Sequence, residues 1–491
     1  MRSESRRRTF LPSRKVSYAL TVIALASGYC YYADRTQIFN KLHKRYSSAE
    51  FRVMCLGTLV LGILSIRQSV QTVVVQGQRS ATKKIDQLFL SRDQTDEWKG
   101  WMQFLILIYH YTGASRVLGI YRVIRILVAS YLFMTGFGHT AYFYRKGDYS
   151  LRRCAAVLLR INFLSCVLPY VMRTDYLFYY FAPLTSFWYV IVYLTMQVGH
   201  AHNQSTKFLI GKIVVSALLV TGLIRAPGVL EAIFLLLERS ARIHWNVTEW
   251  RFRVHLDNYI VYVGMLSAIA FIKISDGLQS DTDGAATVVR VFNRLRTVAL
   301  VAACVTLPAY WVAVASITEK SEYNSWVPYL SCLSILSFVV LRNCSRHLRN
   351  FYSSIFAWLG RHSLETFTLQ FHIWLAADTK GILSLGFEPW QEFVPITIIF
   401  LWVSWQVASA TNVITSWLVD PKADRRDVEI EDSMSDMELP RTKSRDSMSS
   451  YGQIDKALTV SANGICRVLR EKLTVRLALI LTVLWLLNLA Y

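Results

Sequence analysis

Three histidines lie within apolar stretches of the sequence, where an ionisable side chain is costly unless it has a partner or a task. His110 lies in WMQFLILIYHYTGAS, His139 in YLFMTGFGHTAYF and His372 in FAWLGRHSLETFTLQFHIWLAAD. A neutral, buried imidazole can take a proton from a hydroxyl, so each histidine is a candidate general base. The alternative is structural, because a histidine in an apolar helix can simply hydrogen-bond a neighbouring helix.

The neighbours of His110 favour a polar cavity. On a helix, Gln103, His110 and the small pair Gly113 and Ala114 would share one face. Small residues allow helices to approach closely, so this face predicts tight packing around polar side chains. Arg125, in the next apolar stretch, is expected to reach toward a helix end or to line a cavity.

His372 ends a stripe of polar residues. Arg361, Glu365, Thr368 and His372 follow one another at the spacing of a single helical face. Such a stripe has no reason to face lipid, so it predicts a cavity or a path through the protein. Glu365 is therefore a further catalytic candidate. A structural ion pair between Arg361 and Glu365 is an equal alternative.

A cluster of basic residues follows the second histidine. Arg145, Lys146, Arg152 and Arg153 lie in the short segment RKGDYSLRR, and Arg160 lies deeper in the next apolar run. Guanidinium and ammonium groups suit a polyphosphate such as that of coenzyme A. An Arg, Gln or Tyr side chain could stabilise the oxyanion that forms when a hydroxyl attacks a thioester. These residues fit membrane acyl transfer, and they also fit a proton-coupled transporter.

The elements that must position these residues are membrane spans. Hydrophobic residues make up 53% of the 491 residues, and the mean hydropathy is +0.31. They form long runs, such as residues 210–224, 298–317 and 394–413. Runs of about 17–25 residues match the hydrocarbon thickness of a bilayer. The sequence therefore predicts an all-α, polytopic membrane helix bundle of about 11–14 spans, surrounded by membrane lipid.

Charge and cysteine usage exclude several other classes of protein. The formal charge of +21 would suggest a nucleic-acid partner in a soluble protein. Here the Lys and Arg residues lie mostly in short loops between apolar runs, as cytoplasmic loops do, so no nucleic-acid partner is predicted. The eight cysteines show no paired spacing. We therefore expect neither a disulfide framework nor a bound metal.

Alternation of spans gives each loop a side. The basic N-terminal segment MRSESRRRTFLPSRK predicts a cytosolic N-terminus followed by an uncleaved span. Counting onward places RKGDYSLRR and RNCSRHLRN in the cytosol and residues 225–258 in the lumen. His139 is then expected toward the cytosol, and His110 and His372 nearer the lumen.

The glycosylation sequons agree with this count. The lumenal segment contains a sequon at Asn246, and a sequon is modified only on that side of the membrane. Two further sequons begin at Asn203 and Asn343. Both fall on the cytosolic side, so we expect modification at Asn246 alone.

Composition divides the chain into four segments. Residues 1–92 form a basic tail and two accessory spans, and residues 93–419 form the main membrane domain. Residues 420–472 are rich in Ser, Asp and Glu and cannot bury a core, so they are predicted to be a disordered cytosolic linker. Residues 473–491 form a C-terminal anchor span.

Six stretches carry a resemblance to a known family. DEWKGWMQ, YHYTGAS, YLFMTGFGHTAYF, RAPGVLEAIF, EWRFRVHLDNYI and FAWLGRHSLETFTLQFHIWLAAD occur in this order over residues 93–419. They closely resemble the capsule-synthesis-type ten-pass membrane acyltransferase family. That family includes the membrane domain of sialate O-acetyltransferase, plant reduced-wall-acetylation proteins and fungal capsule O-acetylation proteins. The order of the histidine, FMTGF and a basic loop also resembles the acyltransferase-3-type fold.

The resemblance implies an enzyme of the Golgi or ER. Such an enzyme takes acetyl from cytosolic acetyl-CoA and places it on lumenal glycans or on cell-wall or capsule polysaccharide. The resemblance implies catalytic roles for His110, His139 and His372, and a donor-side role for Lys99 in the DEWKG motif. On the acceptor side it implies roles for Arg225, Glu231, Trp250, Arg251 and Asp257.

One departure from the family leaves the last step open. Animal relatives carry a lumenal esterase-like domain with a Gly-Asp-Ser block before the membrane part, and no such block precedes the motifs here. We expect that the membrane domain either completes the transfer or delivers acetyl to a separate lumenal transferase. The alternatives are a transporter of acetyl or acetyl-CoA, and a structural subunit, which would leave the histidines unexplained.

Overall fold

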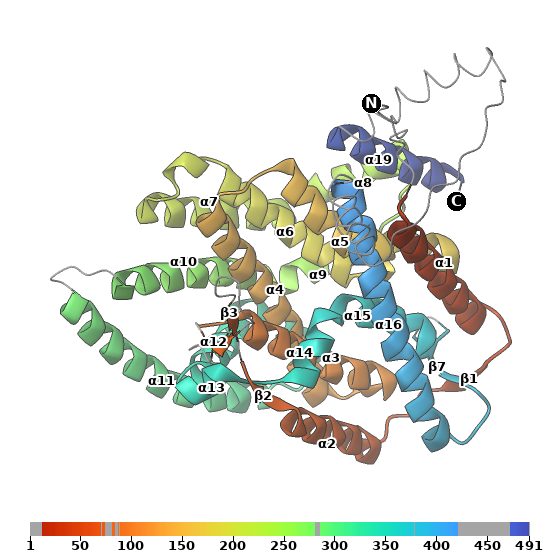
Figure 1. Ribbon diagram of the computed structural model, residues 1–491, viewed down its shortest axis with the longest axis horizontal. Coiled ribbons are helices and arrows are strands. Elements are labelled where there is room, and N and C mark those ends of the chain that lie inside the picture. Colours follow the sequence, from red (N-terminus) through yellow and green to blue (C-terminus); the bar gives the residue numbers. More distant parts are fainter. Residues whose placement is uncertain are drawn as a thin grey trace, which may run out of the picture.

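The computed structural model describes residues 12–69, 71–73, 81–83, 87, 89–279, 285–377, 379–420 and 472–490. Helices dominate the architecture, as predicted (Figure 1). The α-helices are α1 (Arg14–Arg35), α2 (Ser48–Leu64), α3 (Arg92–Tyr111), α4 (Leu118–Lys146), α5 (Leu151–Met172), α6 (Phe181–Gln197), α7 (Thr206–Arg225), α8 (Val229–Ala241), α9 (Val247–Leu256), α10 (Ile260–Gln279), α11 (Ala285–Ala315), α12 (Lys320–Arg342), α13 (Arg346–Asn350), α14 (Ser354–Arg361), α15 (Ser363–Ile373), α16 (Pro389–Val419) and α19 (Leu473–Ala490).

Short strands and single 3-10 turns connect these helices. The strands are β1 (Asn40–His43), β2 (Ile66–Gln68), β3 (Gln71–Val73), β4 (Ala81–Lys83), β5 (Phe351–Ser353), β6 (Leu375–Ala376) and β7 (Gly381–Ser384). The 3-10 turns are η1 (Ala114–Arg116), η2 (Tyr176–Tyr179) and η3 (His200–His202). These strands are too short to change the fold class, which is a helical bundle.

The described helices include nine that are long and apolar enough to cross a membrane. They are α1, α4, α5, α7, the α9–α10 pair, α11, α12, α16 and α19. The other predicted spans correspond to α2 and α6, of 17 residues each, to α3, and to the α14–α15 pair. The prediction of a multi-pass membrane protein is confirmed.

Glycines bring the central helices into close contact. A Cβ atom on Gly360 of α14 would lie 1.8 Å from the carbonyl oxygen of Asp96 in α3. A Cβ atom on Gly264 of α10 would lie 2.3 Å from the carbonyl oxygen of Phe133 in α4. Only glycine permits such backbone contact without displacement. These contacts hold α3 and α4, which carry the first two candidate histidines, in fixed positions.

The predicted span over residues 356–377 is interrupted in the structure. α14 ends at Arg361 and α15 begins at Ser363. Arg361 is exposed, whereas Glu365 and His372 are buried in α15. The prediction of one stripe that includes Arg361 is therefore wrong, because the helix break turns this side chain out of line.

The face predicted beyond His110 also ends early. α3 stops at Tyr111, and Gly113 adopts a left-handed conformation with φ of 66°. Glycine tolerates this conformation, so Gly113 and Ala114 turn the chain toward α4 and do not extend the helical face. The prediction that this pair shares the helical face of His110 is wrong, although Ala114 is fully buried. The glycines of α3, α4, α10 and α14 provide the close packing in its place.

Two small sheets fasten the N-terminal segment to the rest of the bundle. β1 pairs antiparallel with β7, which pairs with β6, so that Asn40 lies opposite Ser384. β2 pairs with β5, with Ile66 opposite Ser353. α1 also packs against α15 and α16. The first two helices therefore belong to the same body as the helices of residues 93–419.

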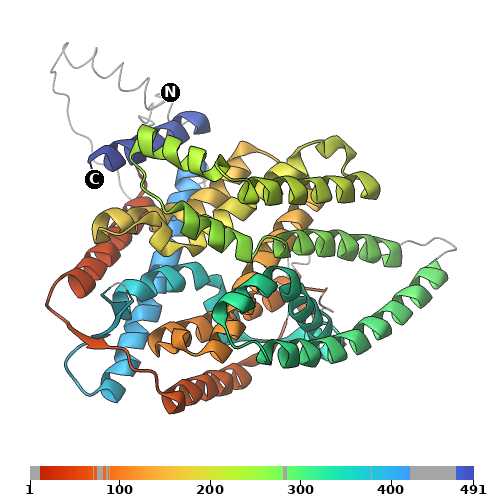
Figure 2. The same ribbon diagram turned by 180° about the vertical axis from the view of Figure 1, so that it is seen from behind.

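The bundle has a central group of helices and two flanks. In Figure 1, α7, α10 and α11 extend to one side, and α1, α16 and α19 lie on the other. Figure 2 shows the same division from behind. α3, α4, α14 and α15, which carry most of the candidate residues, lie between the flanks (Figure 1). The predicted anchor corresponds to α19, and most of the predicted linker lies outside the described residues.

Candidate active site

A basic cavity of about 790 Å³ lies among α3, α4, α5 and α15. Its described lining residues include no Asp or Glu. His139 lines it, with its ring centroid 4.6 Å from that of Tyr189. The cations of the lining are Arg92, Lys99, Arg145 and Arg153. The cavity is therefore electrostatically suited to a polyanion.

The corner between α4 and α5 positions two of these cations. Gly147, with φ of 61°, ends α4, and the Ser150 side chain caps α5 by accepting a hydrogen bond from the backbone N–H of Arg153. Arg145 and Arg153 thus flank the corner. Arg145 lies 5.9 Å from the ring centroid of Phe271, and Arg153 lies over Tyr142 at 4.2 Å. Stacking on rings holds each guanidinium while leaving its N–H edges for a ligand.

The remaining residues of the predicted donor site lie outside this cavity. Lys146 is exposed and does not line it. Arg152 forms an ion pair with Asp420 at 3.0 Å. The structure therefore brings together Lys99, Arg145 and Arg153 of the six predicted donor-site residues, and adds Arg92, which the sequence reasoning missed.

Arg160 has a different partner from the one that a polyphosphate site would require. Its Nη1 lies 2.5 Å from Glu365 Oε1, and its Nε donates to Asn412 at 2.6 Å. Arg160 therefore takes the place of Arg361 as the partner of Glu365. This ion pair ties α5 to α15. It fits the structural interpretation of Glu365, with Arg160 as the partner in place of Arg361.

A second cavity, of about 500 Å³, contains His110. Arg125 and Asp257 line it and pair at 3.0 Å, with both carboxylate oxygens accepting from one guanidinium nitrogen. Arg253 and Glu249 pair beside them at 2.5 Å. We call this the paired-charge cavity. Its remaining described cation is Lys320, which lies 4.1 Å from the ring centroid of Tyr121.

His110 is held by packing and by its backbone. Its ring centroid lies 6.4 Å from that of Phe367 and 5.9 Å from that of Phe371. Lys44, in the loop before α2, donates to the His110 carbonyl oxygen at 2.8 Å. Burial lowers the pKa of Lys44 to about 8. No described residue hydrogen-bonds the His110 imidazole, and His110 lines the cavity.

The other predicted acceptor-side residues stabilise the α7–α8–α9 connection. Arg251 donates twice to Glu231, at 2.8 Å each, and Arg225 donates to the Tyr329 hydroxyl at 2.9 Å. Trp250 is buried and meets Phe187 with 6.0 Å between ring centroids. None of these residues lines the paired-charge cavity. Of the five predicted acceptor-side residues, the structure brings only Asp257 to His110.

A small space lies between the two cavities, and we call it the constriction. It has a volume of about 10 Å³, roughly the space of one water molecule. It shares Tyr131, Phe181 and Ser363 with the basic cavity. It shares Ile106, Val128 and Tyr180 with the paired-charge cavity. The three spaces therefore form one series, with His139 in the lining at one end and His110 at the other.

His372 lies in a sealed hydrogen-bonded cluster. Its Nδ1 is 2.8 Å from Asp34 Oδ2, and its Nε2 is 2.5 Å from the Tyr179 hydroxyl. Asp34 also accepts from the backbone N–H of Ala377 at 2.8 Å. All three side chains are at most 1% exposed. None of them lines the two cavities or the constriction, so the structural interpretation fits His372 better than the catalytic one.

The sequence reasoning missed Asp34 and Lys320. Asp34 is the only carboxylate in α1, so the rule applied to the histidines, that an ionisable residue in a span needs a purpose, would have found it. Lys320 is the first residue of α12. Lysine is common at helix ends, so nothing in the sequence around Lys320 marks it as a functional residue.

The three sequons differ in the exposure of their asparagines. Asn246 is exposed at the N-terminus of α9, whereas Asn203 and Asn343 are 5% and 6% exposed. Asn203 also donates to the Met196 carbonyl oxygen at 3.0 Å. Only Asn246 is accessible to a glycosylating enzyme.

Among the residues that the structure describes, no group of three or more His, Cys, Asp or Glu side chains is placed to hold a metal ion. The seven cysteines in this part of the chain are free. The arrangement instead places a basic cavity and a half-buried imidazole on either side of one constriction.

The sequence profile of a family described as the "10 TM Acyl Transferase domain found in Cas1p" matches residues 2–430. The chain belongs to this family. The resemblance seen in the six motifs is thereby confirmed, and the family match extends over α1 and α2 as well.

A curated relative adds a second similarity. The chain is 37% identical over 406 residues to N-acetylneuraminate (7)9-O-acetyltransferase of Danio rerio, an alignment that covers 80% of this chain and 49% of the relative. The chain therefore spans about half the length of that relative. No solved structure matches the chain.

Proposed function

We propose that this membrane acyltransferase moves an acetyl group from acetyl-CoA to a hydroxyl of a sialic-acid-containing glycan. The observation that carries the proposal is the series of three spaces: a basic cavity, a constriction and a paired-charge cavity with His110. The activity in the relative's name, O-acetylation of N-acetylneuraminate, supports the choice of reaction and of acceptor.

The basic cavity suits the donor. Coenzyme A carries several phosphate charges, and Arg145 and Arg153 offer cationic N–H groups that no described carboxylate binds, whereas Lys99 and Arg92 pair with Asp96 at 2.9 and 3.8 Å. The thioester end of the donor would then point to the constriction at Tyr131 and Ser363. His139 would contact the donor from α4.

The paired-charge cavity suits the acceptor. Its two carboxylates are each paired with an arginine, and Lys320 remains as the one cation in excess. One excess cation matches the single carboxylate of a sialic acid. The arginine–carboxylate pairs would present fixed polar walls to sugar hydroxyls.

His110 would act as the general base. The acceptor oxygen forms a bond to the thioester carbonyl carbon, its proton passes to the imidazole, and the C–S bond breaks to release coenzyme A as the thiolate. His372, with Asp34 and Tyr179, would support α15 without touching substrate. Glu365 with Arg160 would do the same from α5.

The sides follow from the loops that form each cavity. The basic cavity includes residues beside RKGDYSLRR, which the positive-inside rule assigns to the cytosol. The paired-charge cavity includes residues of the segment with the exposed sequon, Asn246, which belongs to the lumen. A cytosolic N-terminus and residence in the Golgi or ER complete this proposal.

The order of the three spaces also favours a second candidate. A path along them would serve delivery of acetyl to a separate lumenal transferase, whereas a transferase that works alone needs acceptor binding in the paired-charge cavity. The two candidates differ in one respect: only the first forms acetylated glycan without a partner.

The test uses the purified full chain in liposomes. Labelled acetyl-CoA is supplied on the basic-cavity side, and a sialylated glycan or a wall polysaccharide on the other. Acetylated glycan that forms without any other protein supports the transferase, and label that crosses without glycan acetylation supports delivery to a partner. Arg152→Ala serves as the control variant, because the Arg152 side chain pairs with Asp420 and does not line the basic cavity.

A further inference from the structure

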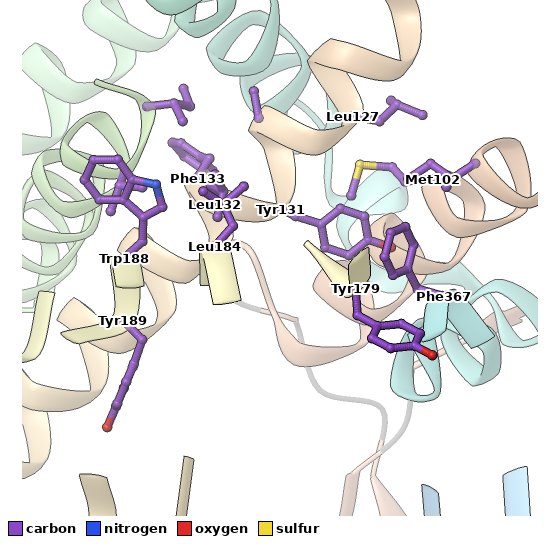
Figure 3. Packing of buried hydrophobic residues seen from close by; sticks show 14 of the residues in the cluster. Met102, Leu127, Tyr131, Leu132, Phe133, Tyr179, Leu184, Trp188, Tyr189 and Phe367 are labelled. Atoms are coloured by element: carbon purple, nitrogen blue, oxygen red, sulfur yellow. The ribbon is translucent and has the colours of Figure 1, made fainter. Parts of the chain in front are cut away.

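The constriction between the cavities is an aromatic collar. It is formed by Tyr131 of α4, Tyr180 and Phe181 at the start of α6, and Phe367 of α15. The ring centroids of Tyr131 and Phe181 are 5.2 Å apart, those of Phe181 and Phe367 are 5.4 Å apart, and those of Tyr180 and Phe367 are 5.6 Å apart. Figure 3 shows Tyr131 and Phe367 on their separate helices. The collar therefore narrows the passage with side chains from three helices.

One polar group of the collar has no partner. Gln103, which is 1% exposed, lines the constriction, and its Nε2 has no hydrogen bond among the described residues. Its Oε1 lies 3.4 Å from the hydroxyl of Tyr131, which donates to the Lys99 carbonyl oxygen at 2.7 Å. An unpaired buried amide costs free energy unless a ligand satisfies it. The Gln103 amide therefore offers an unpaired hydrogen-bond donor beside the aromatic rings of the collar.

We propose that the collar is the acyl-group subsite and that it selects a two-carbon acyl chain. The inference rests on the proposed function, because it needs an acyl-CoA in the basic cavity. The carbonyl oxygen of the acyl group accepts from Gln103 Nε2, and the methyl group packs against Phe181 and Phe367. Each further methylene would have to displace a ring, since the space is about 10 Å³.

The surroundings of the collar resist such displacement. Phe367 also packs against Phe371, with 5.4 Å between ring centroids, and against His110 at 6.4 Å. α3, which carries Gln103, packs backbone to backbone against α14 at Gly100 and Gly360. Overpacking a well-filled site typically costs about 1–3 kcal/mol. Discrimination against longer acyl chains therefore follows from packing alone.

The test compares acyl-CoA donors of increasing length. Wild-type full chain in liposomes is supplied with acetyl-, propionyl- or butyryl-CoA and a sialylated glycan, and kcat/KM is measured for each donor. Phe367→Ala is expected to raise the butyryl-to-acetyl ratio of kcat/KM by about 10–100-fold. Gln103→Leu is expected to lower kcat for all three donors with the KM for acyl-CoA unchanged.

A matched control separates the collar from general loosening of α15. Phe371 lies one turn from Phe367 on the same helix, is 3% exposed and also meets His110, but it does not line the constriction. Phe371→Ala is therefore expected to leave the butyryl-to-acetyl ratio unchanged. Phe367→Leu serves as the second variant if the alanine variant does not fold.

The outcomes separate the two proposals. If the wild type transfers acetyl and the donor ratio stays the same in folded Phe367→Ala or Phe367→Leu protein, the collar is not the acyl subsite. If Phe371→Ala changes the ratio as much as Phe367→Ala does, the collar is again excluded as the selective element. If the wild type transfers no acyl group from any donor, the proposed function fails, and the subsite fails with it.

Discussion

The basic cavity and the paired-charge cavity meet at one constriction but use their cations differently. In the basic cavity Arg145 and Arg153 lie over aromatic rings without a carboxylate partner, although Lys99 of the same lining pairs with Asp96. In the paired-charge cavity Arg125 and Arg253 are each bound by a carboxylate of the same wall. The comparison shows that an arginine's neighbours decide whether it is available to a ligand or fixed as part of the wall.

The largest expected effect concerns the imidazole at the end of the paired-charge cavity. Replacing His110 with alanine is expected to lower kcat about 10²–10⁴-fold, because this change removes the general base. The melting temperature should stay the same, since no described residue hydrogen-bonds the imidazole. Glycan acetylation in liposomes and a thermal melt in detergent measure the two quantities.

His372→Ala provides the contrasting variant. It leaves the buried Asp34 carboxylate without its imidazole partner, so it is expected to lower the melting temperature. A folded, fully active His110→Ala protein would remove His110 from the reaction. An unchanged melting temperature for His372→Ala would show that the sealed cluster contributes little to stability.

The next effect concerns the fixed wall of the paired-charge cavity. Arg125→Leu leaves Asp257, which is 1% exposed, as a buried charge without its partner. The free energy of unfolding is expected to fall by about 3–5 kcal/mol. Chemical denaturation in detergent, followed by tryptophan fluorescence, measures the change.

The neighbouring pair is the matched control for this prediction. The side chains of Arg253 and Glu249 are 31% and 54% exposed, so Arg253→Leu should cost only about 0–1 kcal/mol. The double variant with leucine at positions 125 and 257 should recover much of the lost stability, because it removes both charges. Equal losses for Arg125→Leu and Arg253→Leu would contradict the distinction between a buried pair and an exposed one.

A smaller effect should separate the two cavities by substrate. Arg153→Ala is expected to raise the KM for acetyl-CoA about 10-fold, the value of one charge-assisted hydrogen bond, without changing the KM for the glycan. Lys320→Met should do the reverse. Steady-state kinetics with each substrate varied in turn measure both constants.

The adjacent arginine tests the specificity of this result. Arg152 and Arg153 are adjacent in the first turn of α5. Arg152, however, pairs with Asp420 outside the cavity. Arg152→Ala should therefore leave both KM values unchanged. An equal effect from Arg152 and Arg153 would mean that the general positive charge of the corner attracts the donor and that the cavity has no specific role.

Much of the fold could be predicted because it depends on local composition. Apolar runs predict the helices that cross the membrane, since each span must satisfy its own backbone hydrogen bonds. Reasoning from local composition also predicted the basic segment around Gly147 and singled out His110 of α3 as a candidate. The interruption at His362 was missed, although Gly360, Arg361, His362 and Ser363 interrupt the apolar run there.

The site was harder to predict, since it depends on which helices meet. Tyr131, Phe181 and Phe367 come from three segments, and nothing in any one segment indicates that their rings form a collar. Arg160 was assigned to a polyphosphate because it follows a basic loop, yet its partner, Glu365, lies on a helix 205 residues away. Pairing across the bundle is a tertiary property that residue spacing does not contain.

The smallest effect is a pH dependence confined to the paired-charge side. Lys44, outside the spans, donates to the His110 carbonyl oxygen, and burial lowers its pKa from 10.5 to about 8. Between these two values the unfolded chain binds more protons than the folded protein, so stability should rise with pH through this window. We expect a gain of about 1 kcal/mol between pH 7.5 and 9.5, reduced from the full shift because the side chain is only partly buried. Lys44→Met should remove that part of the pH dependence, and the difference between the two proteins isolates Lys44 from other titrating groups. Identical pH profiles for both proteins would show that the Lys44 ammonium is hydrated and that the loop before α2 does not press it against α3.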